Sequence, residues 1–187
     1  MALTTLDPVT ALIIVDLQKG LVNSTSGSSL VHPIGDIVTR ACALIAAFRR
    51  HALPIVLVNV DGTAPGRTER PRHVAQLPDG WTEFLPELGR QACDIVVTKR
   101  TWGAFASTDL EHRLKARGVT QVVISGVATG TGVESTARQA HEHGLNVTLA
   151  TDAMTDMSSV AHDHSVAHIF PRIGETATTA EILALLD

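Results

Sequence analysis

The sequence predicts an open three-layer α/β sandwich, and two observations carry this prediction. Five short runs rich in β-branched residues are apolar along their whole length, as in strands covered on both faces of a parallel sheet. They alternate with longer segments whose apolar residues recur at intervals of three and four, as in amphipathic helices. Such alternation produces βαβ units with right-handed crossovers. We expect a single domain over residues 1–187, since a chain of this length suits one core.

The expected strands end at polar residues or at a glycine turn. They occupy residues 11–15, 54–60, 94–98, 121–125 and 146–150. A short sixth run at 169–171 contains Pro171, which places it at a sheet edge or ends it. Ligands of open parallel sheets bind outside the carboxyl ends of the strands. The residues that follow the five main runs are Asp16, Asp61, Lys99, Gly126 and the pair Thr151-Asp152.

The helical pattern covers residues 34–51, 109–117, 133–143 and 178–183. Gly118 and Gly144 fit the ends of the second and third helices. Thr178 is placed to cap the last helix, and Glu181 stands three residues on, as in a capping box. Residues 61–85 are rich in Gly, Pro and charge, and a loop of this length is often a lid or a binding loop.

Composition and charge exclude several classes of protein. Hydrophobic residues make up 44% of the chain and charged residues 18%, which excludes a charge-dominated disordered chain. The net charge of −4 provides no basic surface for nucleic acid or an anionic membrane. The apolar runs are too short to span a bilayer, and no signal peptide is apparent. We expect a cytoplasmic protein in which Cys42 and Cys93 are buried small hydrophobic residues.

Opposite charges follow two of the expected strands. A charge at the end of a buried strand costs desolvation free energy unless it finds a partner, and Asp16 and Lys99 could pair across neighbouring strands. A partly desolvated pair has perturbed pKa values that suit proton transfer, but structural ion pairs perturb pKa values as well. These two residues alone leave a catalytic pair and a structural ion pair equally open.

Three motifs in order resemble those of the isochorismatase-like hydrolases. They are residues 11–18, which end in Asp16-Leu17-Gln18; residues 99–105 with 108–110; and residues 123–129 with 133–138. The resemblance covers nearly the whole chain and implies a six-stranded, mostly parallel sheet flanked by helices. It also implies homo-oligomers formed through helix faces, and a pocket that holds an Asp, a Lys and usually a Cys.

The sequence departs from that family at the nucleophile. Asp16 and Lys99 match the first two site residues, but Gly132 stands where most cysteine hydrolases of the family carry the thiol. A thioester mechanism then lacks its thiolate, and Thr131 and Ser135, the conceivable substitutes, have no evident base beyond Asp16. True isochorismatases resemble this chain, since they too lack the thiol and keep the Asp and the Lys.

That resemblance implies hydrolysis of an isochorismate-type vinyl ether, a small anionic metabolite, without a covalent intermediate. Asp16 would protonate the methylene carbon of the enolpyruvyl group, water would add to the oxocarbenium ion, and the hemiketal would collapse to pyruvate and an alcohol. Lys99 would orient this acid or bind the substrate carboxylate. Desolvation raises the pKa of such an acid and a close ammonium lowers it, and the sequence does not say which prevails. Two alternatives stay open: a retired family member that binds a metabolite or a partner, and an amide hydrolase with an unrecognised nucleophile.

The turn after the fourth strand contributes candidate substrate-binding residues. It resembles the family segment with a non-proline cis peptide before Ala128. Gly130 and Gly132 lead from there into a helix, so backbone N–H groups near Ala128, Thr129 and Thr131 would point into the pocket and favour an anion. The other interpretation is that the glycines only make a tight turn.

Three more residues could contact the substrate. Arg67, on the long loop, could clamp a carboxylate, or it could be a solvated loop arginine. Trp102 and Phe105 follow Lys99 closely and could wall the pocket or a subunit contact.

We expect neither a metal site nor a cofactor. His164 and His168 could chelate from one helix, but no third ligand is evident nearby, and catalytic zinc ordinarily has three protein ligands. The Asp-x-His arrangement of metal-binding family members is absent after Asp61, and no G-x-G-x-x-G dinucleotide motif follows the first strand. The expected partner is a small-molecule substrate, with no nucleic acid and no membrane.

Overall fold

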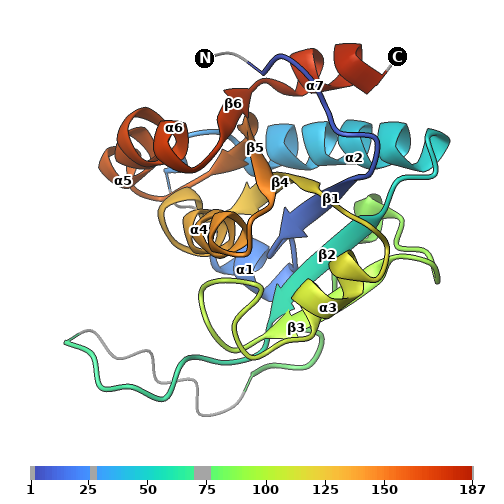
Figure 1. Ribbon diagram of the computed structural model, residues 1–187. Helices are drawn as coiled ribbons and strands as arrows, with labels where there is room; N and C mark the ends of the chain where they lie inside the picture. Colours follow the sequence, from blue (N-terminus) through green and yellow to red (C-terminus); the bar gives the residue numbers. More distant parts are fainter. Residues whose placement is uncertain (1–2, 26–28, 70–76, 187) are drawn as a thin grey trace.

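The computed structural model describes residues 3–25, 29–69 and 77–186, and a six-stranded sheet forms its centre (Figure 1). All strands run parallel, in the order β3-β2-β1-β4-β5-β6. They are β1 (Thr10–Val15), β2 (Ile55–Val60), β3 (Ile95–Lys99), β4 (Gln121–Val127), β5 (Asn146–Thr155) and β6 (Glu175–Ala177). The order reverses direction at β1, so the carboxyl ends of β1 and β4 form the topological switch point where ligands of such sheets bind.

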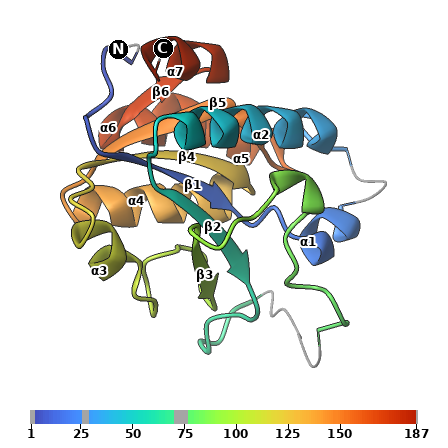
Figure 2. The ribbon, with the colours of Figure 1, turned by 90° about the vertical axis from the view of Figure 1, so that its right-hand side faces the viewer.

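Helices cover both faces of the sheet, and the predicted three-layer α/β/α sandwich is confirmed (Figure 2). Helices α2 and α7 lie on one face, and α3 and α4 on the other. The α-helices are α1 (Lys19–Ser24), α2 (Ile34–Arg50), α3 (Leu110–Lys115), α4 (Glu134–Glu142), α5 (Ser159–His164), α6 (Phe170–Ile173) and α7 (Thr179–Leu186). Shorter turns are the 3₁₀ segment η1 (Pro86–Leu88) and the π-helical segments η2 (Thr129–Val133) and η3 (Ser165–Ile169).

The central strand β1 shows why an uninterrupted apolar run becomes a strand here. All six of its residues are buried, because alternate side chains enter two different cores. Ile13 and Val15 join the cluster under α3, α4 and α6, whereas Leu12 and Ile14 join the cluster under α2 and α7. The structure therefore buries the apolar run on both faces, as the pattern indicated.

The predicted capping box at the last helix is present. The backbone N–H and the hydroxyl of Thr178 donate to Oε2 of Glu181 at 2.7 and 2.8 Å, and the Glu181 N–H donates to Oγ1 of Thr178 at 3.3 Å. Asp152 adds a further acceptor, since its Oδ1 lies 2.7 Å from the Thr179 nitrogen. These bonds satisfy N–H groups that the first turn of α7 leaves without helical partners.

Two expectations about strands are wrong. Residues 169–171 are helical, and the sixth strand is Glu175–Ala177; Pro171 fits because a helix tolerates proline in its first turn. The fifth strand does not end before Thr151-Asp152 but runs on to Thr155. After an irregularity in its pairing with β4, the buried Met154 pairs with Gly126.

The expectation that both cysteines are buried is also wrong. Cys93 is exposed before β3, and Cys42 is half-buried on α2, where its thiol donates to the Glu87 carbonyl at 3.3 Å. Neither cysteine is enclosed by a hydrophobic core. Cys93 lies in a turn, and Cys42 lies at the edge of the apolar face of α2. Within the described ranges, no helix is both long and apolar enough to cross a membrane.

Candidate active site

An ion pair between Asp16 and Lys99 lies at the carboxyl ends of the strands. The Lys99 ammonium donates to Oδ2 of Asp16 at 2.7 Å and to the Thr101 carbonyl at 3.2 Å. The two residues are not on neighbouring strands as expected, because β2 lies between β1 and β3. Strands two places apart are separated by about 10 Å, which the long lysine stem helps to bridge.

The backbone turns sharply where Asp16 leaves β1. Its φ of 56° lies in the left-handed region, which Asp tolerates better than most residues. The Asp16 N–H still donates to the Val58 carbonyl at 2.8 Å, as if the strand continued. The next polar residue, the buried Gln18, ties this turn to β2: its Nε2 donates to the Val60 carbonyl at 3.0 Å, and its Oε1 accepts from the Val60 N–H at 2.7 Å.

Burial prevails over the lysine in setting the protonation of Asp16. The residue is only 4% exposed, and this desolvation raises the pKa of its carboxyl from 3.8 to about 6, although the charge and hydrogen bond of Lys99 lower it. In the described part of the chain, Oδ1 of Asp16 has no hydrogen-bond partner. The raised pKa increases the fraction of molecules that carry this proton near neutral pH.

A cavity of about 620 Å³ opens beside this pair. Of the nine residues expected at the site, six line it: Asp16, Lys99, Trp102, Ala128, Thr131 and Gly132. Its wall also includes Leu21 and Val22 of α1, Leu30 from the segment before α2, and Ile34, the first residue of α2. These four follow β1 along the chain without any charge or motif, so sequence reasoning did not find them.

Gly132 places no side chain beside the Asp16 carboxyl. A Cβ at this position would lie 3.2 Å from Oδ2 of Asp16, 3.1 Å from the Val127 carbonyl oxygen and 3.1 Å from a methyl group of Val15. These are tight contacts, yet longer than the 3.0 Å below which a neighbour must shift. The backbone at Gly132 therefore faces the Asp16 carboxyl closely enough for a side chain at 132 to touch it.

The turn after β4 is built as expected but uses its N–H groups internally. The peptide bond between Val127 and Ala128 is cis. The N–H groups of Thr131 and Val133 donate to the Ala128 carbonyl at 3.2 and 3.1 Å, and that of Gly130 donates to Oδ2 of Asp156 at 2.9 Å. Because these three N–H groups donate to acceptors within the protein, fewer backbone N–H groups of the turn are available to bind an anion.

Three expected residues do not line the cavity. Thr129 is buried, and its hydroxyl lies 2.9 Å from Nδ1 of His162, whose pKa is lowered by burial and by His32. Phe105 belongs to the apolar core under α3 and α4. Arg67 is exposed, although the residues on both sides of it, Gly66 and Thr68, do line the cavity. Part of its loop, residues 70–76, lies outside the described residues.

Sequence reasoning missed Asp156, a second carboxylate of the cavity lining. The sequence placed Asp152 at the end of the fifth strand, but Asp152 faces α7 and pairs with Arg40 at 3.2 Å. Because β5 continues to Thr155, Asp156 is the acidic residue that follows its carboxyl end. The buried pair Ala153-Met154 was the signal that the strand runs on.

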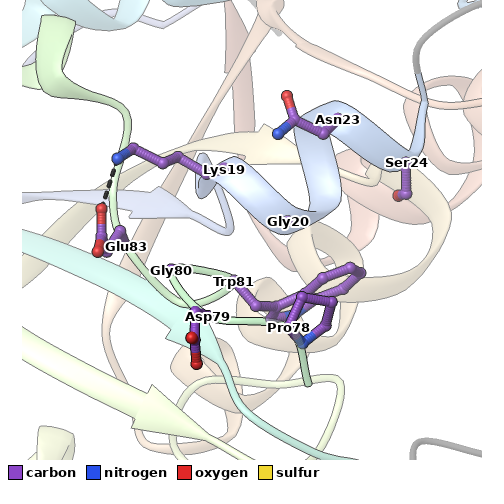
Figure 3. Close-up of a pocket in the computed structure, with 9 residues that line it drawn as sticks. All are labelled: Lys19, Gly20, Asn23, Ser24, Pro78, Asp79, Gly80, Trp81 and Glu83. Atoms are coloured by element: carbon purple, nitrogen blue, oxygen red, sulfur yellow. Dashed lines mark hydrogen bonds and ion pairs between the residues drawn. The ribbon is translucent and has the colours of Figure 1, made fainter. Parts of the chain in front are cut away.

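A second cavity, of about 610 Å³, lies between α1 and residues 78–83 (Figure 3). Lys19 reaches across to Glu83 in an exposed ion pair, and the Trp81 ring packs against α1 at Gly20, where a Cβ would lie 2.1 Å from it. Its lining has no buried charged side chain, unlike the cavity beside Asp16. Of these two cavities, only the one beside Asp16 therefore has a buried ion pair in its wall.

The histidines form no metal cluster in the described residues. The rings of His164 and His168 lie 5.2 Å apart on the surface. Across residues 3–25, 29–69 and 77–186, no three His, Cys, Asp or Glu side chains are grouped so as to hold a metal ion.

Known proteins with the same sequence pattern and the same fold identify the family. Residues 10–181 match the Isochorismatase domain family. The chain is 42% identical to the isochorismatase family protein YwoC of Bacillus subtilis over 93% of this chain and 92% of that protein. It is 36% identical to streptothricin hydrolase of Streptomyces noursei over 78% of this chain and 49% of that one. The solved structure of an isochorismatase family protein from Burkholderia thailandensis superposes with a TM-score of 0.91, at 39% identity and 97% coverage of both chains. The chain is therefore a hydrolase of the isochorismatase family.

Proposed function

We propose that this protein hydrolyses an isochorismate-type vinyl ether on a small anionic metabolite, with Asp16 as the acid and without a covalent or metal-bound intermediate. The observation that carries the proposal is a carboxyl whose pKa is raised to about 6, in a cavity where Gly132 faces it without a side chain. An acid of this strength is partly protonated near neutral pH, as general acid catalysis requires.

The hydrogen bonds of Asp16 support one position for the transferable proton. Lys99 donates to Oδ2, and an oxygen that accepts from an ammonium is a poor place for a proton. Oδ1 has no partner among the described residues, so we assign the proton to Oδ1; this oxygen is enclosed by protein atoms, and the carboxyl must turn to present the proton to the cavity. Lys99 then orients the acid by holding the opposite oxygen.

The lining supports a non-covalent mechanism over an acyl-enzyme. Thr131 is the hydroxyl nearest in sequence to Gly132 that lines the cavity, and in the described structure its side chain makes no hydrogen bond to a base. Ser135, the other conceivable nucleophile, does not line the cavity. A hydroxyl without a base is a weak nucleophile, so direct addition of water is the simpler route.

Anion recognition rests on Arg67 and Lys99. Arg67 is exposed between two lining residues, Gly66 and Thr68, and we propose that its guanidinium makes a bidentate contact with a substrate carboxylate. Trp102 lines the same cavity with 66% of its surface exposed, and it offers a flat apolar contact to an unsaturated ring.

The test is pyruvate release from isochorismate, followed with a coupled lactate dehydrogenase. We expect turnover by the wild-type protein and loss of it in Asp16→Asn. The matched control is Glu111→Gln, which removes one charge from the exposed ion pair with Lys115 on α3, away from the cavity lining, and should leave turnover unchanged. Saturable binding without turnover on isochorismate or a panel of amides would instead indicate a catalytically inactive family member that binds a metabolite. Amide turnover alone would indicate an unrecognised nucleophile.

Two further expectations stay proposals. We propose a cytoplasmic homo-oligomer, and two exposed apolar side chains that line the cavity, Trp102 and Met157, support association of copies there. Sedimentation equilibrium of the purified protein would test the oligomeric state.

A further inference from the structure

Two carboxylates, from Asp16 and Asp156, line the same cavity, and only the first has a role in the mechanism above. We propose that Asp156 is a second catalytic residue, which accepts a proton from the water that adds to the oxocarbenium ion. This proposal rests on the proposed vinyl-ether hydrolysis and assigns its second half-reaction to a named side chain.

Asp156 is fixed in place from both sides. Its Oδ2 accepts the Gly130 N–H at 2.9 Å, and its Oδ1 accepts the Ser158 N–H at 3.0 Å. A carboxylate has about four lone-pair sites, so these two bonds leave it room to accept from a water molecule. The residue is 8% exposed and belongs to the cavity wall, so a water bound there would stand at the edge of the substrate space.

The turn at residues 128–132 lies between the two acids. A Cβ on Gly132 would be 3.2 Å from Oδ2 of Asp16, and a Cβ on Gly130 would be 3.5 Å from Oδ2 of Asp156. Two glycines separated by one residue therefore each adjoin one carboxylate. Glycoside hydrolases use two carboxylates at an oxocarbenium-like centre, one as acid and one as base for water, and the proposed division of roles follows that chemistry.

The proposed cycle returns every proton. Asp16 gives its proton to the methylene carbon, which becomes a methyl group, and the ether carbon becomes an oxocarbenium ion. The water oxygen bonds to that carbon, and one water proton passes to Asp156. The bond between that carbon and the ether oxygen then breaks: Asp156 returns its proton to the departing alcohol oxygen, and the hemiketal hydroxyl gives its proton to Asp16. One water is consumed, and pyruvate and an alcohol are released.

A purely structural role for Asp156 predicts a different experimental result. The bond from Oδ1 to the N–H two residues on is an Asx turn, and the bond to Gly130 steadies the cis-peptide turn. If these bonds were its whole contribution, replacing Asp156 would weaken the fold or the turn, and an added carboxylate in solution would not restore the rate.

The experiment compares Asp156→Ala, Asp156→Asn and Thr129→Val on isochorismate, with and without sodium formate. Thr129→Val removes the hydroxyl that contacts His162 and so loosens the same turn while keeping both carboxylates. We expect kcat to fall about 10²- to 10⁴-fold in both Asp156 variants, the range for loss of a general base, with little change in KM. Formate should raise kcat several-fold in Asp156→Ala and should not do so in Thr129→Val.

Each outcome decides between the two proposals. Full kcat in either Asp156 variant, or a loss in Asp156→Ala that formate does not relieve while thermal unfolding shows intact protein, overturns the role of Asp156 and leaves Asp16 as the acid. If Asp156→Ala does not fold, Asp156→Asn carries the kinetic test alone. Absence of turnover in the wild-type protein overturns the proposed function, and the role of Asp156 with it.

Discussion

The Lys99 ammonium lies 2.7 Å from Oδ2 of Asp16 across an intervening strand, and yet the pKa of that carboxyl is raised. An ammonium at this distance favours the ionised carboxylate, but the desolvation of a carboxyl that is 4% exposed outweighs it. The pair therefore combines a carboxyl whose pKa is about 6 with a cation that donates a hydrogen bond to one of its oxygens. The predictions about activity follow from this balance.

The rate should fall as the pH rises through the pKa of Asp16. In the proposed mechanism Asp16 acts only when protonated, and its pKa is about 6. We expect kcat/KM for isochorismate to decrease about tenfold per pH unit above that value, since each unit leaves a tenth of the protonated form. A pH–rate profile from pH 5 to 9 measures this, and a constant rate over that range would contradict the role of Asp16 as the acid.

Replacing Lys99 should move the midpoint of the pH–rate profile to higher pH. The charge and the hydrogen bond of Lys99 both lower the pKa of Asp16, so Lys99→Met leaves desolvation unopposed and the pKa rises above about 6. The midpoint of the pH–rate profile should shift upward, with a lower maximal rate because the acid loses its orienting partner.

The matched control for this substitution is Lys19→Met. It breaks the exposed ion pair with Glu83 and leaves Asp16 untouched. Its midpoint should stay at the wild-type pH. A downward shift in Lys99→Met would contradict the assigned balance of effects.

A thiol at position 132 should change the reaction from vinyl-ether hydrolysis to amide hydrolysis. The Cβ of Gly132→Cys would lie 3.2 Å from Oδ2 of Asp16, close enough for the thiol to be deprotonated by that group, with Lys99 nearby. We expect vinyl-ether turnover to fall and hydrolysis of small amides to appear, together with alkylation of the new thiol by iodoacetamide.

Gly132→Ala separates the steric effect from the chemical one. It places the same Cβ against Val127, Val15 and Asp16 without a thiol. Amide hydrolysis should be absent in this variant. If both variants behaved alike on amides, the rest of a covalent site would not be present here.

Stability should depend strongly on one glycine and hardly on another. Gly126 has a φ of 120°, and a Cβ there would lie 2.1 Å from the Val15 carbonyl oxygen of the neighbouring strand. Gly126→Ala should lower the free energy of unfolding by more than about 4 kcal/mol or prevent folding. Gly35→Ala, on α2 with nothing within 4 Å of the new Cβ, should raise it by up to about 1 kcal/mol. Urea unfolding followed by circular dichroism compares the two.

The apolar pattern was sufficient for most of the fold. Runs such as residues 11–15 and 121–125 are buried on both faces because strands of a parallel sheet are covered by helices on both sides. The pattern misjudged 169–171, where Phe170 is buried from a helix rather than a strand. Short apolar runs do not distinguish these cases, because burial alone sets their composition.

The sequence by itself determined the alternation of the first five strands with four of the helices, the three motifs and the presence of a glycine at position 132, since these depend on residue types and their spacing. Only the tertiary structure decided that Lys99 reaches over β2 to Asp16, that desolvation prevails at this carboxyl, and that Asp156 rather than Asp152 adjoins the cavity. The physical reason is that desolvation and charge interactions depend on distances between groups far apart along the chain, and packing alone sets those distances.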